Sequence, residues 1–154
     1  MRLTVFAILL LALLGSCTCL PEPTVDITPP TAGLIIEFSV NGVVESRTFS
    51  HQDPEVTLDA DEDRNISIIY MGSDNEGMKS LNIMVTVYRT IGGSIQQRED
   101  WTVAPITVSC PKDTLLEQMK FNRNEGERTI RLVVKSRNWK GLTTITQPLK
   151  VKVR

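Results

Sequence analysis

The sequence predicts an all-β domain, a sandwich of about seven to nine short antiparallel strands. Apolar and polar residues alternate through most of the chain after residue 33, as in Ile130, Leu132 and Val134. This period of two indicates strands with one buried face. Turn signals such as Asn41-Gly42 recur about every 8–12 residues, a spacing typical of sandwiches and barrels. Only 5% of the residues are aromatic, so Ile, Val and Leu must fill most of the core.

The first strands are expected at 34–40 and 43–49, joined by Asn41-Gly42. This dipeptide favours a two-residue hairpin because a type I′ turn needs positive φ at both central positions. A short strand is expected at 55–58, before an acidic turn at 59–64.

The later strands are expected between further turn signals, at 65–70, 80–90, 94–103, 106–110, 129–136 and 142–153. Polar turns are predicted at 72–77 and 138–141, and Gly92-Gly93 predicts another. Thr114 and Glu117 have the spacing of a capping box, which predicts one short helix near 114–119.

Residues 1–16 have the organisation of an export signal. A single Arg2 precedes ten apolar residues, from Val5 to Leu14, and small residues follow. The run is too short to span a bilayer core, which needs about 20 apolar residues.

The motif Leu14-Gly15-Ser16-Cys17 resembles the lipobox of bacterial lipoproteins. The resemblance implies cleavage before Cys17, a lipid thioether on its sulfur and acylation of the new amino terminus. Such multiple acylation gives stable membrane attachment. Thr18 at the next position implies the outer membrane of the bacterial envelope. The alternative is an ordinary secretory signal cut after Cys17 or Thr18.

Three segments are therefore expected. Residues 1–16 form the signal, residues 17–32 a lipidated and proline-rich tether, and residues 33–154 the sandwich. Removal of 16 of the 154 residues leaves 138, about one domain. If Cys17 carries lipid, Cys19 and Cys110 are the remaining cysteines, and we favour a reduced or buried Cys110 over a Cys19–Cys110 bridge.

The charge is nearly balanced. Removal of Arg2 with the signal leaves 16 basic and 18 acidic residues, a net charge of −2. This balance argues against nucleic acid as a partner. Acidic residues gather before residue 77 and basic residues after residue 122. We interpret this asymmetry as a solvated face, although it could steer a charged partner.

Two segments resemble the immunoglobulin-like domains of bacterial envelope proteins, including the PKD and cadherin-like groups. In the segment 66–85, a strand leads into Asp74-Asn-Glu-Gly77 and then into a second strand. In the segment 130–153, a strand, a turn and a long final strand follow one another. The resemblance implies an immunoglobulin-like β-sandwich over about residues 31–154. No cysteine occupies the strands that carry the inter-sheet disulfide of antibody domains.

Few residues suggest chemistry. Asp59, Asp61 and Asp63 alternate as in a calcium loop, but the glycine and final glutamate of an EF-hand are missing. No metal, cofactor or catalytic residue is therefore assigned. His51 and the nearby Asp53 could suggest a catalytic base and the residue that orients it. The sequence contains no nucleophile motif to complete such a site. Trp139, at a turn tip, is the one candidate for contact with a ligand.

The sequence thus predicts a non-catalytic, lipid-anchored envelope protein. Its expected role is binding or scaffolding of a protein partner at the envelope, through loops or an exposed sheet edge. The alternative is a secreted module that binds a glycan or calcium.

Overall fold

The computed structural model describes residues 28–61, 66–92, 94–121 and 126–154. Most of these residues lie in strands and none is helical, so the all-β prediction is confirmed. The strands are β1 Gly33–Val40, β2 Val43–Ser50, β3 Val56–Ala60, β4 Ser67–Ile91, β5 Ser94–Trp101, β6 Ile106–Lys120, β7 Arg128–Asn138, β8 Thr143–Ile145 and β9 Leu149–Val153.

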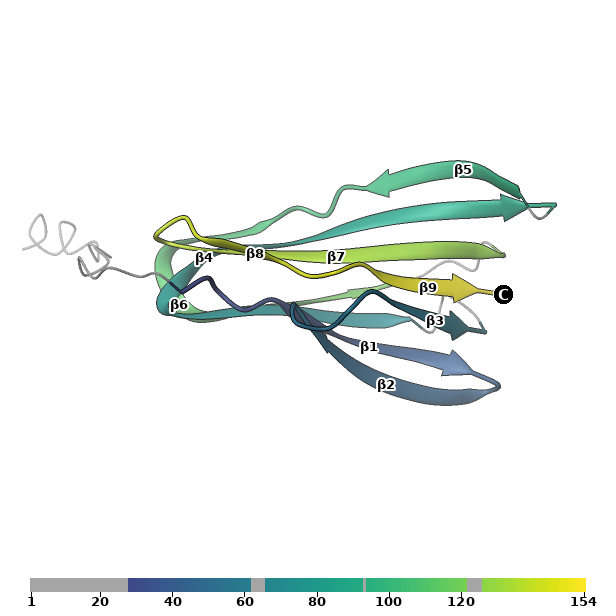
Figure 1. The fold of residues 1–154 in the computed structure, drawn as a ribbon, viewed down its shortest axis with the longest axis horizontal. Coiled ribbons are helices and arrows are strands. Elements are labelled where there is room, and N and C mark those ends of the chain that lie inside the picture. Colours follow the sequence, from purple (N-terminus) through teal and green to yellow (C-terminus); the bar gives the residue numbers. More distant parts are fainter. Residues whose placement is uncertain (1–27, 62–65, 93, 122–125) are drawn as a thin grey trace, which may run out of the picture.

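The nine strands form a mixed, sandwich-like sheet in the order β2-β1-β4-β7-β9-β3. β5 and β6 also pair with β4, and β8 pairs with β7. β4 joins the two layers (Figure 1). Its first part pairs with β1 and with the end of β6, and its second part pairs with β7 and β5.

β4 bends where a turn was expected, at 72–77. The predicted reversal of the chain is wrong, because one strand of 25 residues continues through this segment. Its register to β6 shifts between Ser73, Met78 and Ser80, and such bulges increase local bending and twist. Gly77 has φ +91°, and a Cβ there would lie 2.4 Å from Cβ of Pro111. The glycine therefore lets β4 and β6 bend against each other.

The predicted helix near 114–119 is also wrong. These residues belong to β6, and Leu115, Glu117 and Met119 lie opposite Gly72, Tyr70 and Ile68 of β4. A helix this short is marginal by itself. The backbone hydrogen bonds of a paired strand therefore override the capping-box pattern.

The β1–β2 hairpin confirms the Asn-Gly prediction. Val40 pairs with Val43, and Asn41 and Gly42 have φ values of +52° and +75°. Both lie in the left-handed region that a type I′ turn requires. One pairing differs from expectation, because β3 runs parallel to β9, with Val56 opposite Leu149. The segment 51–55 carries the chain from β2 to β3 in that direction.

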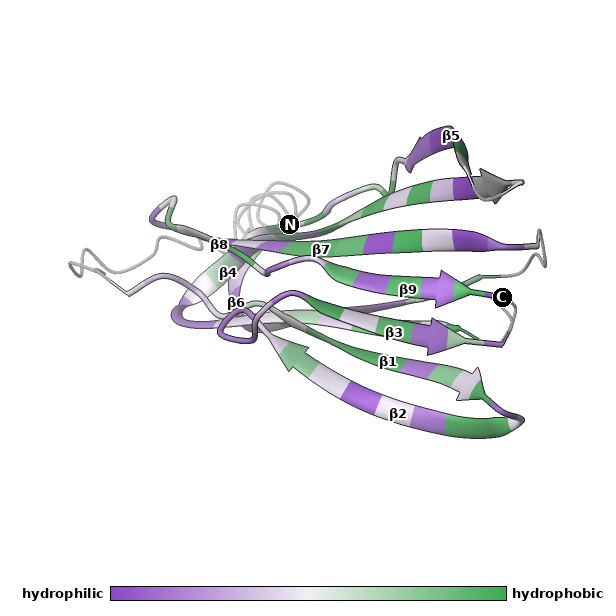
Figure 2. Ribbon diagram, turned by 45° about the vertical axis from the view of Figure 1, so that its right-hand side comes forward, coloured by the Kyte–Doolittle hydropathy of each residue, from purple (hydrophilic) through white to green (hydrophobic). Residues whose placement is uncertain are grey.

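The core lies between the layers and consists mainly of aliphatic side chains. Ile36, Ile68, Ile130, Leu132 and Val134 are all fully buried. Figure 2 shows the alternation of apolar and polar residues along β7, β9 and β3. Period-two patterning therefore identified the buried faces correctly.

The molecule is elongated and its two ends differ (Figure 1). The chain enters at the end formed by the β4 bend, the start of β6 and the turn after β7, here called the tether end. The turns after β1 and β4 and the C-terminal Arg154 lie at the opposite end, here called the free end.

Candidate functional site

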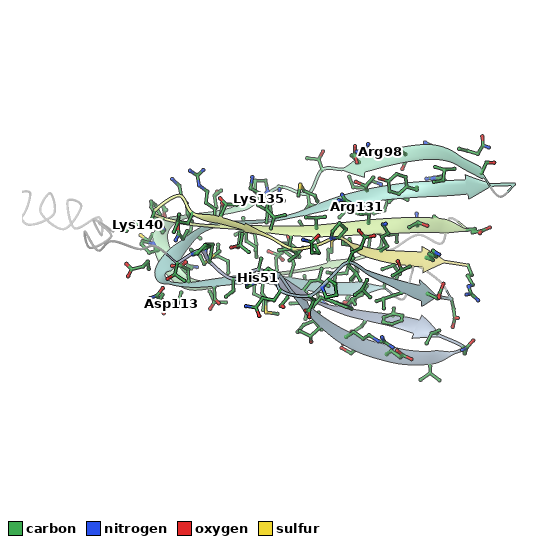
Figure 3. All side chains as sticks on the ribbon, viewed as in Figure 1. His51, Arg98, Asp113, Arg131, Lys135 and Lys140 are labelled. Carbon is green, nitrogen blue, oxygen red and sulfur yellow. The ribbon has the colours of Figure 1, made fainter. Side chains whose placement is uncertain are left out.

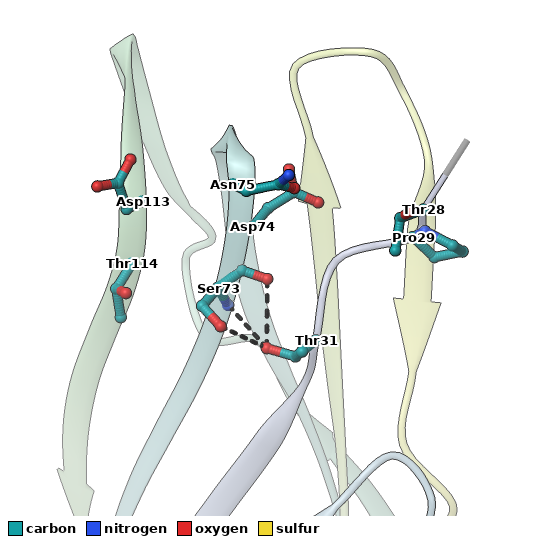
Figure 4. Close-up of a pocket in the computed structure, with 8 residues that line it drawn as sticks. All are labelled: Thr28, Pro29, Thr31, Ser73, Asp74, Asn75, Asp113 and Thr114. Atoms are coloured by element: carbon teal, nitrogen blue, oxygen red, sulfur yellow. Dashed lines mark hydrogen bonds between the residues drawn. The ribbon is translucent and has the colours of Figure 1, made fainter. Parts of the chain in front are cut away.

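A polar cavity of about 480 Å³ lies at the tether end (Figure 4). Its lining comes from the chain entering the domain, the β4 bend and β6. The lining residues are Thr28, Pro29, Thr31, Ser73, Asp74, Asn75, Asp113 and Thr114. Seven of these eight residues carry a side-chain oxygen, so the cavity offers hydrogen-bond partners to a hydroxylated molecule.

Thr31 fastens the entering chain to β4. Its N–H donates to the Ser73 carbonyl at 2.8 Å, and its Oγ1 accepts from the Ser73 N–H at 3.1 Å. The two hydroxyls lie 2.7 Å apart. Pro30 and Ala32 on either side are buried. The last residues of the predicted tether therefore lie against the domain and form one wall of the cavity (Figure 4).

Asp74 ties the β4 bend to the turn after β7. The side chain is buried, and its two carboxylate oxygens accept from the Glu76 N–H at 2.8 Å and from Asn138 Nδ2 at 3.2 Å. Asn138 Oδ1 in turn accepts from the Leu142 N–H at 2.9 Å. Asp74 therefore acts as a structural acceptor at the cavity wall.

Trp139 lies half-buried in the same turn. Its backbone N–H donates to the Gly77 carbonyl at 3.1 Å. Lys79 Nζ lies 5.2 Å from the centre of its ring, a cation–π geometry. The tryptophan thus folds back toward the β4 bend, but it does not line the polar cavity. Its contact with a ligand stays a prediction.

Trp101, at the end of β5, is partly buried and packs against the core. Its ring lies 5.2 Å from that of Phe121, and the buried guanidinium of Arg128 approaches both rings within about 6 Å. Burial lowers the pKa of Arg128.

A row of basic side chains follows the outward face of β7 and continues on β9. It consists of Arg131, Lys135, Arg137, Lys150 and Lys152, here called the basic face. Figure 3 labels Arg131 and Lys135 on β7. Residues i and i+2 of a strand lie about 7 Å apart on the same face. Arg131 lies directly opposite Lys150, so the cations occupy two neighbouring rows.

Only one of these five cations forms an ion pair with a described residue, although Asp59 lies opposite Lys152 and Arg131 attracts Asp100. Lys150 pairs with Glu55, but Arg131, Lys135, Arg137 and Lys152 make no ion pair with any residue that the structure describes. Sequence alone could place the bases late in the chain. It could not show that they share one face, because that depends on how β7 pairs with β9.

A second opening, of about 400 Å³, adjoins the basic face where β5 leaves β4. Asp100 there accepts from Thr86 Oγ1 at 2.7 Å and pairs with Arg98 at 3.1 Å. The hydrogen bond from Thr86, followed by Arg98, lowers the pKa of Asp100. This carboxylate therefore stays charged and offsets Arg98.

Asp61, in the suggested calcium loop, has a structural role as a hydrogen-bond acceptor. Its carboxylate accepts from the N–H groups of Asn41 and Gly42 and from Ser39 Oγ. Asp59 pairs with Arg154 at 3.3 Å, and Asp63 lies outside the described residues. Within the described ranges, no three His, Cys, Asp or Glu side chains gather to hold a metal ion.

His51 and Asp53 form no hydrogen bond with each other, and each has a partner elsewhere. Asp53 accepts from the N–H and Oγ of Ser50 at 2.6 and 2.9 Å, and these bonds lower its pKa. His51 donates its backbone N–H to the Ala32 carbonyl at 2.8 Å. Both residues therefore brace the chain after β2.

Cys110 is half-buried and forms a disulfide. The expectation of a reduced or buried thiol is wrong, because Cys110 is only half-buried and a second sulfur is bonded to it. Cys17 and Cys19 lie outside the described residues, as do the lipobox and most of the tether.

Comparison with known proteins finds no family model and no curated protein that this chain matches. Among the described residues, no helix has the length and apolar character needed to cross a membrane.

Proposed function

We propose that this chain is a non-catalytic binding or scaffolding module of a bacterial cell envelope, held to the outer membrane by lipid on Cys17. The lipobox-like motif at residues 14–17 supports the anchor. The immunoglobulin-like interpretation belongs to the same proposal, since the strands form a sandwich-like fold and such sandwiches host many binding modules.

The basic face is the observation that favours binding. Four of its cations, Arg131, Lys135, Arg137 and Lys152, have no ion-pair partner among the described residues. Such a surface attracts an acidic partner and steers its approach. The preferred partner is therefore an envelope protein with an acidic surface.

Charge reversal tests this binding surface. Lys135→Glu with Arg137→Glu should lower crosslinking of the anchored protein to its envelope partner at least tenfold. Lys112→Glu with Lys120→Glu on β6 makes the same change in net charge elsewhere and should leave crosslinking within twofold. An equal loss of crosslinking in both double variants would show that net charge alone causes the effect. That result would contradict the proposed binding surface.

The anchor has its own test. The intact mass of the membrane-extracted protein should show cleavage before Cys17 and added acyl mass, and Cys17→Ala should lose both. A soluble, unacylated protein cut one or two residues later would contradict the anchor and favour a secreted module.

Glycan binding is the second candidate, and the oxygen-bearing side chains of the polar cavity, together with the half-buried Trp139 in the turn after β7, favour it. Saturable binding of a glycan that Trp139→Ala abolishes would support it. Calcium binding receives less support, since Asp61 already accepts three hydrogen bonds. A screen for hydrolase activity and protease inhibition would reveal an enzyme or inhibitor, the remaining alternatives.

A further inference from the structure

β2 is an open edge of the sheet. It pairs only with β1 among the described strands, through an unbroken register from Val40↔Val43 to Gly33↔Ser50. In Figures 1 and 2 it forms one border of the molecule. Natural edge strands are usually protected by lysine, proline, a bulge or a covering element. β2 has no lysine, proline, bulge or covering strand among the described residues, and its charged side chains, Glu45 and Arg47, form an ion pair with each other at 3.0 Å.

The free backbone groups of β2 belong to alternate residues. His51 N–H donates to the Ala32 carbonyl, in line with the β1–β2 register, so the odd-numbered residues of β2 direct their N–H and C=O groups to β1. The even-numbered ones point away. Ser50 N–H accordingly bonds to Asp53 rather than to β1. Val44, Ser46 and Thr48 therefore have N–H and C=O groups along the edge that no described strand pairs with.

Two apolar side chains are exposed on the same strand. Val43 and Val44, next to the hairpin turn, are 62% and 73% exposed. Both are far from the core, and exposed β-branched residues on an unprotected edge favour pairing with another strand.

The sequence of β2 is complementary to itself. When two copies run antiparallel with Ser46 opposite Ser46, Glu45 of each copy lies opposite Arg47 of the other. Val43 then faces Phe49, and Val44 faces Thr48. The even-numbered pairs are the ones that exchange hydrogen bonds, as the free N–H and C=O groups require, and they supply about six such bonds.

Neighbouring registers are worse. A shift in one direction places Glu45 opposite Glu45, and a shift in the other places Arg47 opposite Arg47. Like charges directly opposite each other destabilise a strand pair, whereas opposite charges stabilise it. Only the register centred on Ser46 gives two ion pairs and avoids both repulsions.

Two other edge strands, β5 and β6, lack this combination. β5 departs from a bulge between Arg89 and Thr90. β6 contains Pro111 and two register shifts against β4. Both features are devices that discourage edge-to-edge pairing.

We propose that two copies of this chain pair through β2, antiparallel and centred on Ser46, to form a two-fold symmetric dimer. The symmetry makes the interface isologous, as in most homodimers. The exposed Val43 and Val44 are then covered by Phe49 and Thr48 of the second copy. This proposal is independent of what the basic face binds, because the two surfaces lie on different strands.

A cysteine crosslink tests this β2–β2 register in the full-length protein, in the membrane of the cells that produce it. In the proposed dimer the two Ser46 Cα atoms lie about 5.5 Å apart, inside the range for a disulfide. Ser46→Cys should therefore give an oxidised dimer. Thr48→Cys is the matched control, since the offset of four residues separates those Cα atoms by about 14 Å. The unchanged chain gives the background from native cysteines.

Charge variants test the ion pairs. In the Ser46→Cys background, Glu45→Lys makes positions 45 and 47 both basic. Arg47→Glu makes the same two positions both acidic. Each alone should lower crosslinking at least fivefold, because like charges then face each other. Coexpression of the two, with different tags, should restore a mixed dimer. The side chains of Glu45 and Arg47 are solvent-accessible in each copy. Protease resistance equal to that of the parent verifies that the variants fold.

The proposal is overturned if Ser46→Cys gives no dimer above background, or if Thr48→Cys crosslinks equally. It is also overturned if the charge variants crosslink as well as the parent, or if coexpression restores nothing. Strong Ser46 crosslinking, weak Thr48 crosslinking and rescue in the mixed dimer together support it.

Discussion

The carboxylate of Asp61 accepts a hydrogen bond from the backbone N–H of Gly42 at 2.8 Å. The Asn41 N–H donates to the same carboxylate at 2.9 Å. An acidic residue just after β3 therefore closes over the tight turn between β1 and β2. Asp61 N–H also donates to the Ser39 carbonyl at 2.8 Å, so β3 and β1 are joined at the free end.

This relationship predicts a pH-dependent contribution to stability. The hydrogen bonds from Gly42 and then Asn41 lower the pKa of Asp61. A lowered folded-state pKa stabilises the native protein above the unfolded value of about 3.9, and this stabilisation is lost as pH falls through the folded value. Asp61→Asn should therefore have a lower Tm than the parent at pH 7, and the gap should narrow as the pH falls below the unfolded pKa of about 3.9 and through the lower folded-state pKa.

Thermal unfolding followed by circular dichroism from pH 7 to pH 2.5 measures this gap. Asp113→Asn is the control, because that exposed carboxylate accepts no hydrogen bond from a described residue, and it should leave the Tm nearly unchanged. A constant gap for Asp61→Asn across the whole range would contradict the titration and leave only a loss of packing.

Gly77 predicts a second effect, on the bend of β4. Gly77→Ala would place Cβ 2.4 Å from Cβ of Pro111 at a φ of +91°, so we expect a loss of at least about 2 kcal/mol in unfolding free energy. Gly92→Ala also has positive φ, +60°, but no atom within 4 Å. It should cost only about 1 kcal/mol. Urea unfolding measures both, and equal losses would show that strain rather than the Pro111 contact dominates.

Local patterns predicted the strands well and their connections less well. Ile130, Leu132 and Val134 are buried as period-two alternation requires, because each strand buries one face. Asn41-Gly42 predicted the β1–β2 hairpin correctly, because the two-residue turn itself requires positive φ at both residues. At 72–77 similar turn residues form a bend within β4 rather than a reversal of the chain. Polar and glycine residues permit either outcome, and pairing with β6 and β7 decides between them.

The candidate sites depended even more on tertiary pairing. Asp61 suggested a calcium ligand because acidic residues alternate at 59, 61 and 63, but its carboxylate accepts hydrogen bonds from a turn about 20 residues earlier. The basic face requires the register between β7 and β9. Thr114 and Glu117 matched a helix signal, but their strand partners on β4 are more than 40 residues away. Such long-range pairings cannot be derived from local spacing.

Thr31 predicts how firmly the tether is attached to the domain. Thr31→Val removes the hydroxyl that accepts from Ser73 N–H and contacts Ser73 Oγ, while the backbone bond to the Ser73 carbonyl remains. We expect a cost of about 0.5–1.5 kcal/mol in unfolding free energy. Cleavage of the chain near Thr28 by a broad protease should be several-fold faster. Thr48→Val on β2 is a control and should leave this cleavage unchanged.

Cys110 predicts how the domain is joined to its anchor. The chain contains three cysteines, and Cys110 forms a disulfide. If lipid occupies the sulfur of Cys17, Cys19 must be the partner of Cys110. A non-reducing peptide map of the membrane form should therefore contain a Cys19–Cys110 pair, and Cys110→Ser should free one alkylatable thiol and cost about 2–4 kcal/mol. A Cys17–Cys110 pair would instead contradict lipidation, because one sulfur cannot carry both bonds. With the expected pair, the tether end is fixed two residues from the lipid, so the basic face and the β2 edge extend away from the membrane.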